Sequence, residues 1–132
     1  MKVVDASVIY KWYSPEESSE TALQLLRDTR DGEQLCAPDL GLYEIANVLR
    51  FAPGISAAEI DFVLDNLAAH DIQFEVISLP LLKDAARLAL KHGITVYDAV
   101  YVALARSLGC EFVTADRKLA RKLGSLAFVR VL

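Results

Sequence analysis

The sequence predicts a three-layer α/β/α domain with a central parallel sheet of about four to five strands. Short apolar segments with the length of buried strands recur along the chain, at 2–4, 34–37, 73–77, 111–114 and 126–131. Segments with apolar residues at helical spacing lie between them. Because strands that alternate with helices form a parallel sheet covered on both faces, this is the fold class that we expect.

The composition is that of one compact domain spanning residues 1–132. Hydrophobic residues make up 54% of the chain and charged residues 24%, which excludes a disordered protein. The formal net charge of −4 argues against nucleic-acid binding through bulk charge alone, although a bound cation or a local basic patch would reverse this locally. Two cysteines, Cys36 and Cys110, offer neither a disulfide framework nor metal-site spacing.

Three helices are expected in the first half of the chain. The first begins at Ser14–Glu17, where a capping serine, a proline and two acids come together, and it ends near Asp31. The second spans 40 to about 53. The third opens with a capping-box sequence and spans 56 to about 69.

Three further helices are expected in the second half. Pro80 opens a helix that ends at His92 before a glycine. The segment 97–107 is apolar all round, which is typical of a helix that is buried on every side. A short basic helix at 116–122 separates the last two strands.

Two acids lie just after predicted strands. Asp5 comes after the first strand, and Asp116 follows the strand 111–114 after one intervening residue. Ligands of parallel sheets bind beyond the carboxyl ends of the strands, near a switch in strand order. We therefore expect both carboxylates at that edge.

Two more acids lie in apolar helices. Asp98 is in the first turn of the buried helix, and Thr95 can cap that helix. The alternative is that Asp98 serves only the helix start. However, burial of an unpaired carboxylate costs more free energy than the helix dipole contributes. Glu44 shares a helical stripe with Val48, and its alternative is the solvent edge of an amphipathic helix.

Together Asp5, Glu44, Asp98 and Asp116 suggest a metal centre. Four carboxylates cannot share one pocket in ionised form unless cations neutralise them. Oxygen ligands suit Mg²⁺ or Mn²⁺, which bind phosphate oxygens and lower the pKa of bound water. The chemistry this predicts is hydrolysis of a phosphodiester.

The chain resembles the PIN-domain ribonucleases, and in size the VapC toxins of toxin–antitoxin pairs. Four segments carry the resemblance: VVDASV at 3–8, LYEIANVL at 42–49, TVYDAVYVALA at 95–105 and FVTADRKL at 112–119. They occur in the family's order and cover essentially the whole chain.

The resemblance implies a metal-dependent endoribonuclease, with Mg²⁺ or Mn²⁺ held by Asp5, Glu44, Asp98 and Asp116. Ser7 and Thr114 correspond to hydroxyl residues that line the pocket in the family. It also implies a homodimer and a VapB-type antitoxin that covers a groove. Trp12, Tyr13, Phe51 and Phe62 are candidate anchors for that partner, with ordinary core packing as the alternative.

A basic stretch follows Asp116 immediately. We expect Arg117 and Lys118 to contact phosphates of the RNA substrate, since phosphate contacts supply most of the affinity for nucleic acid. The alternative is a solvated helix face.

Rival functions remain at this point. A magnesium-binding phospho-acceptor receiver domain has a similar size, but it needs an aspartate at the end of its third strand, where this chain has 76–78 (Val-Ile-Ser). The other rivals are a PIN-like module that binds a partner without cleaving, and the same fold acting on DNA. The N-terminus has no signal-peptide pattern and no apolar run is long enough to span a bilayer, so we expect a cytoplasmic protein without membrane contact.

Overall fold

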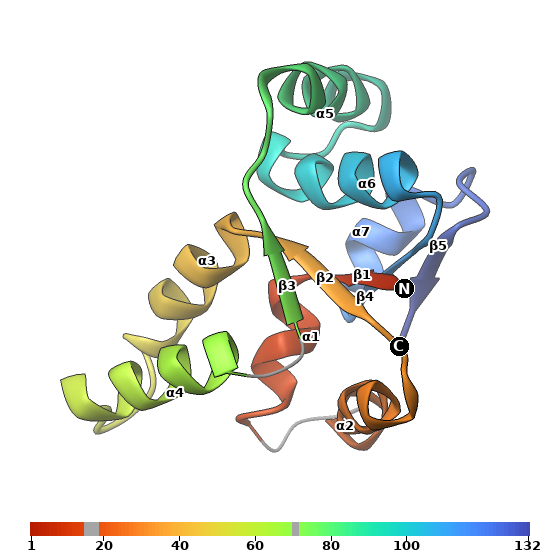
Figure 1. The fold of residues 1–132 in the computed structure, drawn as a ribbon. Helices are drawn as coiled ribbons and strands as arrows, with labels where there is room; N and C mark the ends of the chain where they lie inside the picture. Colours follow the sequence, from red (N-terminus) through yellow and green to blue (C-terminus); the bar gives the residue numbers. More distant parts are fainter. Residues whose placement is uncertain (15–18, 70–71) are drawn as a thin grey trace.

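Five parallel strands form a single sheet in a computed structural model that describes residues 1–14, 19–69 and 72–132 (Figure 1). The strands are β1 (Lys2–Val4), β2 (Leu35–Pro38), β3 (Ile72–Glu75), β4 (Glu111–Thr114) and β5 (Val129–Val131). Their order across the sheet is β3-β2-β1-β4-β5, which confirms the predicted parallel sheet. Receiver domains have the order 2-1-3-4-5, so this topology excludes that rival.

Helices cover both faces of the sheet. They are α1 (Ala6–Lys11), α2 (Ser19–Asp28), α3 (Leu40–Leu49), α4 (Ala57–Ala69), α5 (Leu79–His92), α6 (Val96–Leu108) and α7 (Arg117–Lys122), with a 3₁₀ turn, η1, at Thr29–Asp31. Helix α6 packs on β1, β2 and β4, and α5 lies on its outer side, whereas α1 and α2 lie on the opposite face (Figure 1). Helices α3 and α4 extend to one side of the sheet (Figure 1).

The apolar helix α6 is the centre of the core. Its residues 99–105 are all buried, as expected for a helix without a polar face. The Thr95 hydroxyl accepts a hydrogen bond from the Asp98 backbone N–H at 3.1 Å, so the predicted N-cap is confirmed. At the other end Gly109 adopts φ +65°, which ends the helix.

The structure differs from the predicted elements near the N-terminus. Helix α1 was not expected: its N-cap, Asp5, was interpreted only as a site residue, and the helix has just six residues. The predicted start of α2 at Pro15–Glu17 lies outside the described residues. Helix α3 ends at Leu49, earlier than expected, and a turn covers the residues before Pro53.

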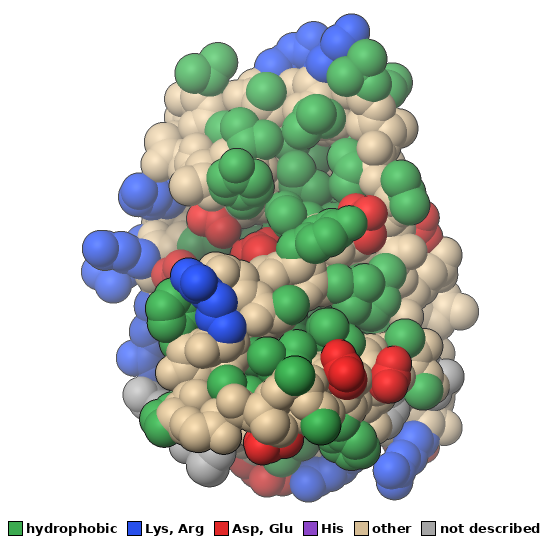
Figure 2. All heavy atoms as spheres, turned by 90° about the vertical axis from the view of Figure 1, so that its left-hand side faces the viewer, with side chains coloured by type: hydrophobic (Ala, Val, Ile, Leu, Met, Phe, Trp, Pro, Cys, Tyr) green, Lys and Arg blue, Asp and Glu red, His purple; other side chains and the backbone are tan. Residues whose placement is uncertain are grey.

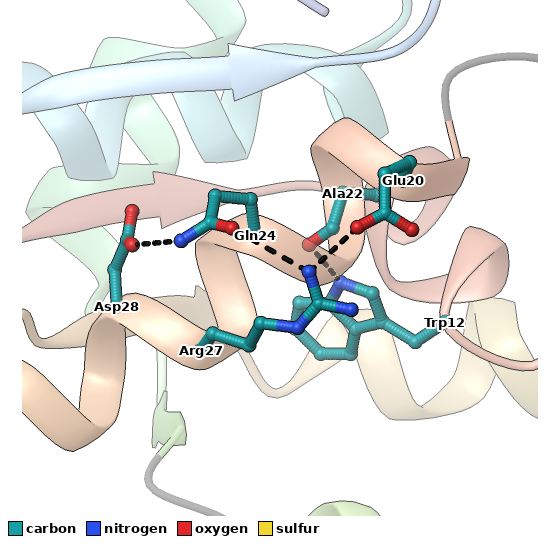
Figure 3. A network of polar contacts seen from close by, with 6 residues as sticks. All are labelled: Trp12, Glu20, Ala22, Gln24, Arg27 and Asp28. Carbon is teal, nitrogen blue, oxygen red and sulfur yellow. Dashed lines mark hydrogen bonds and ion pairs between the residues drawn. The ribbon is translucent and has the colours of Figure 1, made fainter.

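Trp12 fixes the junction between α1 and α2. Its indole Nε1 donates to the carbonyl oxygen of Ala22 at 2.7 Å, beneath the solvent-exposed ion pair of Arg27 and Glu20 (Figure 3). Exposed pairs of this kind contribute little, so the part-buried indole contact contributes more to this junction. None of the described helices has the length and apolar character needed to cross a membrane.

Candidate active site

Asp5 stands at the carboxyl end of β1 and is only 7% exposed. Its carboxylate caps α1 by accepting a hydrogen bond from the backbone N–H of Val8 at 3.2 Å. Ser7 Oγ donates to Oδ1, and Thr114 Oγ1 donates to Oδ2 at 2.5 Å. Burial raises the pKa of Asp5 to about 6 in spite of these hydrogen bonds, and the nearby charge of Asp98 adds to the rise.

Ser7 and Thr114 join the ends of β1 and β4 around Asp5. Ser7 Oγ also accepts from the backbone N–H of Ala115 at 2.9 Å, and Thr114 Oγ1 accepts from that of Asp116 at 3.0 Å. The structure places Ser7 in the lining of the cleft, whereas Thr114 is fully buried beneath it. Thr114 therefore orients Asp5 from below and does not face the cleft.

Glu44 enters the site from α3. Its Oε1 accepts a hydrogen bond from the Tyr101 hydroxyl at 2.9 Å. Burial raises the pKa of Glu44, the tyrosine contact opposes this, and the charges of Asp5 and Asp98 raise it further. The side chain is half-buried and belongs to the lining of the same cleft as Asp5.

Asp98 and Asp116 complete the acidic set. Burial raises the pKa of Asp98, and the charge of Asp116 has the same effect. Asp116 itself is exposed, and its Oδ1 caps α7 by accepting from the backbone N–H groups of Lys118 at 2.9 Å and Leu119 at 3.0 Å.

All four predicted acids line one cleft of about 250 Å³, which we call the acidic cleft. Its other lining residues are Ala6, Ser7, Tyr10, Val48 and Tyr101. No lysine or arginine belongs to this lining. The face in Figure 2 carries acidic side chains across its middle, with hydrophobic side chains above and below them.

The donor chemistry of the acidic cleft suits a hard divalent cation. Its candidate ligands are carboxylates, and the charges of neighbouring carboxylates raise the pKa values of Glu44 and Asp98, a repulsion that a cation would relieve. Within the described ranges, no three Asp, Glu, His or Cys side chains are close enough to form a ready-made set of ligands. Mg²⁺ usually keeps several waters and takes only one or two carboxylates, so an open cleft of this kind is compatible with it.

Of the two residues predicted to bind phosphate, only one lies next to the acidic cleft. Lys118 lines a second cleft beside the acidic one, whereas Arg117 lines neither cleft. Tyr101 was missed as a site residue, although it lies one helical turn after Asp98 and this spacing puts both on one helix face. Gly41 makes room for it, since a Cβ at that position would lie 3.1 Å from the tyrosine hydroxyl oxygen.

The sequence matches the PIN domain model over residues 2–123, and the chain therefore belongs to the PIN-domain family. It is 44% identical over 128 residues to Ribonuclease VapC3 of Pyrobaculum aerophilum, covering 94% of this chain and 95% of that protein. Within the family it thus belongs to the VapC group.

Two further proteins are similar to this chain, one in sequence and one in fold. Exonuclease VapC9 of the same organism is 32% identical over 90 residues, which cover 68% of each chain. A chain in a toxin–antitoxin complex from Klebsiella pneumoniae has the same fold, with a TM-score of 0.74, 13% identity, and coverage of 98% of this chain and 96% of that one.

Proposed function

We propose that the chain is a metal-dependent endoribonuclease and the toxin of a toxin–antitoxin pair. The observation that carries this is the convergence of Asp5, Glu44, Asp98 and Asp116 on one cleft that contains no cationic side chain. The similarity to Ribonuclease VapC3 supports RNA as the substrate. A single domain over residues 1–132 and a place in the cytoplasm, where RNA is available, complete the proposal.

The four carboxylates would hold Mg²⁺ or Mn²⁺ in this function. When bound, the ion supplies positive charge for the phosphate and lowers the pKa of water that attacks it. Asp5 is held in one orientation by Ser7, Thr114 and the Val8 backbone, so it needs no rearrangement to serve as a ligand. Tyr101 orients Glu44 by donating a hydrogen bond to its carboxylate.

The proposed partners are a second copy of the chain and a VapB-type antitoxin. A toxin–antitoxin complex among the structural neighbours supports the antitoxin. Of the predicted anchors, Phe51 and Phe62 are 69% and 65% exposed and remain available, Phe51 in the turn after α3 and Phe62 on α4. Trp12 and Tyr13 instead pack on the core, and Tyr13 donates to Asn66 Oδ1 at 2.9 Å. We therefore keep only the two phenylalanines as anchors.

The first test is cleavage of a labelled single-stranded RNA with Mg²⁺, with Mn²⁺ and with EDTA. Asp5→Asn and Asp98→Asn are expected to lose more than about 100-fold in rate, because each removes charge that the cation requires. Asp61→Asn on the exposed side of α4 is the matched control and should retain activity. Metal-independent cleavage, or equal rates in all variants, would contradict the proposal.

An exonuclease among the relatives makes the mode of cleavage a separate question. Linear RNA and covalently closed circular RNA of the same sequence distinguish the modes, since a circle has no end for an exonuclease. We expect the circle to be opened in the presence of metal. Degradation of the linear RNA alone would replace the endonuclease by an exonuclease without removing the metal centre.

A further inference from the structure

A second cleft of about 340 Å³ adjoins the acidic cleft. Asp98 and Asp116 belong to the lining of both, so the two clefts are neighbours. The second cleft lies between α7 and the turn that joins α5 to α6, and Lys118 and Lys122 are part of its wall. We call it the lysine cleft.

The two lysines are presented on one side of α7. They are four residues apart, a spacing that places side chains on the same face of a helix. Lys122 Nζ donates to the carbonyl oxygen of Gly93 at 3.1 Å, so its ammonium group is held at the cleft wall. Its charge also reaches the acidic set, because it lowers the pKa of Asp98.

The other two cations of this helix belong elsewhere. Arg121 Nε donates to the backbone carbonyl of Arg117 at 3.3 Å, and neither arginine lines the acidic or the lysine cleft. The basic stretch thus divides into a lysine pair at the cleft and an arginine pair outside it. The acidic cleft itself has no lysine or arginine among its described lining residues.

A nucleic-acid strand carries a negative charge at every linkage, and phosphate contacts position it. A strand whose scissile phosphate lies over the four carboxylates has neighbouring phosphates on both sides. Among the described residues that line the two clefts, lysines occur only in the lysine cleft and arginines in neither. The protein therefore offers an asymmetric path for the strand.

We propose that the lysine cleft binds the RNA phosphate next to the scissile one, with Lys118 and Lys122 as its contacts. This inference rests on the proposed ribonuclease function. It predicts that the protein contacts the strand on one particular side of the scissile phosphate. Lys122 is an additional substrate-binding residue, and the arginine pair is dispensable for this contact.

The test compares charge-matched double variants on an RNA that the wild type cleaves. Lys118→Gln/Lys122→Gln is expected to raise KM about tenfold with kcat little changed, because a remote phosphate contact stabilises ground state and transition state alike. Arg30→Gln/Lys83→Gln, on exposed surfaces away from both clefts, is the control for net charge. Lys118→Arg/Lys122→Arg should restore KM, and thermal melting confirms that each variant is folded.

A methylphosphonate scan then locates the contact. A single neutral linkage should weaken wild-type activity most at one linkage, on one side of the cleavage site only. The lysine variant should be insensitive at that position. An equal loss in Arg117→Gln/Arg121→Gln, or sensitivity on both sides, would overturn the lysine cleft as a defined subsite.

Binding in EDTA separates this inference from the proposed function. Fluorescence anisotropy of labelled RNA gives the slope of the logarithm of the binding constant against the logarithm of the salt concentration. For the lysine variant this slope should be shallower by about 0.7, the value for one phosphate of a single strand. Absence of cleavage by the wild type would refute the nuclease, while the salt dependence would still decide the cleft. An unchanged slope would refute the cleft in an active nuclease.

Discussion

Asp5 combines a buried position with an ionisable group, and this sets the acid–base behaviour of the site. Burial raises its pKa from 3.8 to about 6, since water no longer solvates the charge. Hydrogen bonds from Ser7, Thr114 and the Val8 backbone oppose the rise without cancelling it. Without metal, the native protein therefore retains a proton on Asp5 at pH values where the unfolded chain has lost it.

This difference predicts how stability depends on pH. In EDTA, the contribution of Asp5 to the free energy of unfolding is fully present below about pH 4 and is lost as pH rises through about 6. A shift of about 2 pH units corresponds to roughly 3 kcal/mol. Asp5→Asn should remove this slope and stabilise the metal-free protein at pH 8 by about 1–3 kcal/mol. Urea unfolding from pH 4 to 8 measures it, and parallel curves for the two proteins would contradict it.

Tyr101 is the second residue whose role is testable alone. It is 1% exposed, and its hydroxyl lowers the pKa of Glu44 by donating a hydrogen bond. Tyr101→Phe keeps the packing and should destabilise the fold by about 1–2 kcal/mol. It should also reduce the rate of cleavage. Because the pKa of Glu44 then rises, the acid limb of the pH–rate profile should move to higher pH.

The control is Tyr97→Phe on the same helix, where the ring is 65% exposed. Stability and pH profile should match the wild type. If Tyr101→Phe changes stability but leaves the rate and its pH dependence unchanged, the tyrosine only supports the core and does not position Glu44.

A helix start decides where Asp98 lies. Thr95 caps α6 and thereby fixes the turn that carries Asp98, and Ser56 caps α4 through hydrogen bonds with the Glu59 backbone at 3.2 Å and side chain at 3.0 Å. Thr95→Ala and Ser56→Ala should each cost about 1 kcal/mol of stability. Only Thr95→Ala should also reduce cleavage, since α4 contributes nothing to the acidic cleft. Equal activity in both would show that the cap does not position Asp98.

The same elements show what local sequence could predict. The caps of α4 and α6 were predictable because capping residue and helix are neighbours in the chain. The cap of α1, Asp5, is also a neighbour of its helix, but the contact that orients it comes from a hydroxyl 109 residues away at Thr114 and could not be predicted. For the same reason the depth of Thr114 and the contact of Tyr101 with Glu44, 57 residues apart, were missed.

At the scale of the whole molecule, strand order brings the acids together. The strands β1 and β4 are neighbours in the middle of the sheet, so Asp5 and the turn carrying Asp116 meet at one edge. This position followed from the strand pattern and the rule for parallel sheets. The sequence could not predict that the basic stretch divides into a lysine pair at the cleft and an arginine pair outside it. This division depends on how α7 is rotated against the turn after α5.

The gathered charge predicts that a divalent cation stabilises the fold. Four carboxylates repel one another in the native cleft but lie apart in the unfolded chain, so an ion that binds the native state raises the free energy of unfolding. At a Mn²⁺ concentration 100 times its dissociation constant, the gain is about 2.7 kcal/mol. The gain should shrink at pH 5, because protons compete for carboxylates whose pKa values are raised.

Urea unfolding with Mn²⁺ and with EDTA, at pH 8 and pH 5, measures this gain without any RNA. Asp5→Asn/Asp98→Asn should lose it, and Asp61→Asn/Asp65→Asn, with the same change in net charge on exposed parts of α4, should keep it. Stabilisation that persists in the first variant would place the ion outside the acidic cleft. Stabilisation lost equally in both would mean that the ion responds to net charge, because a specific site depends on which carboxylates are removed and a diffuse ion atmosphere does not.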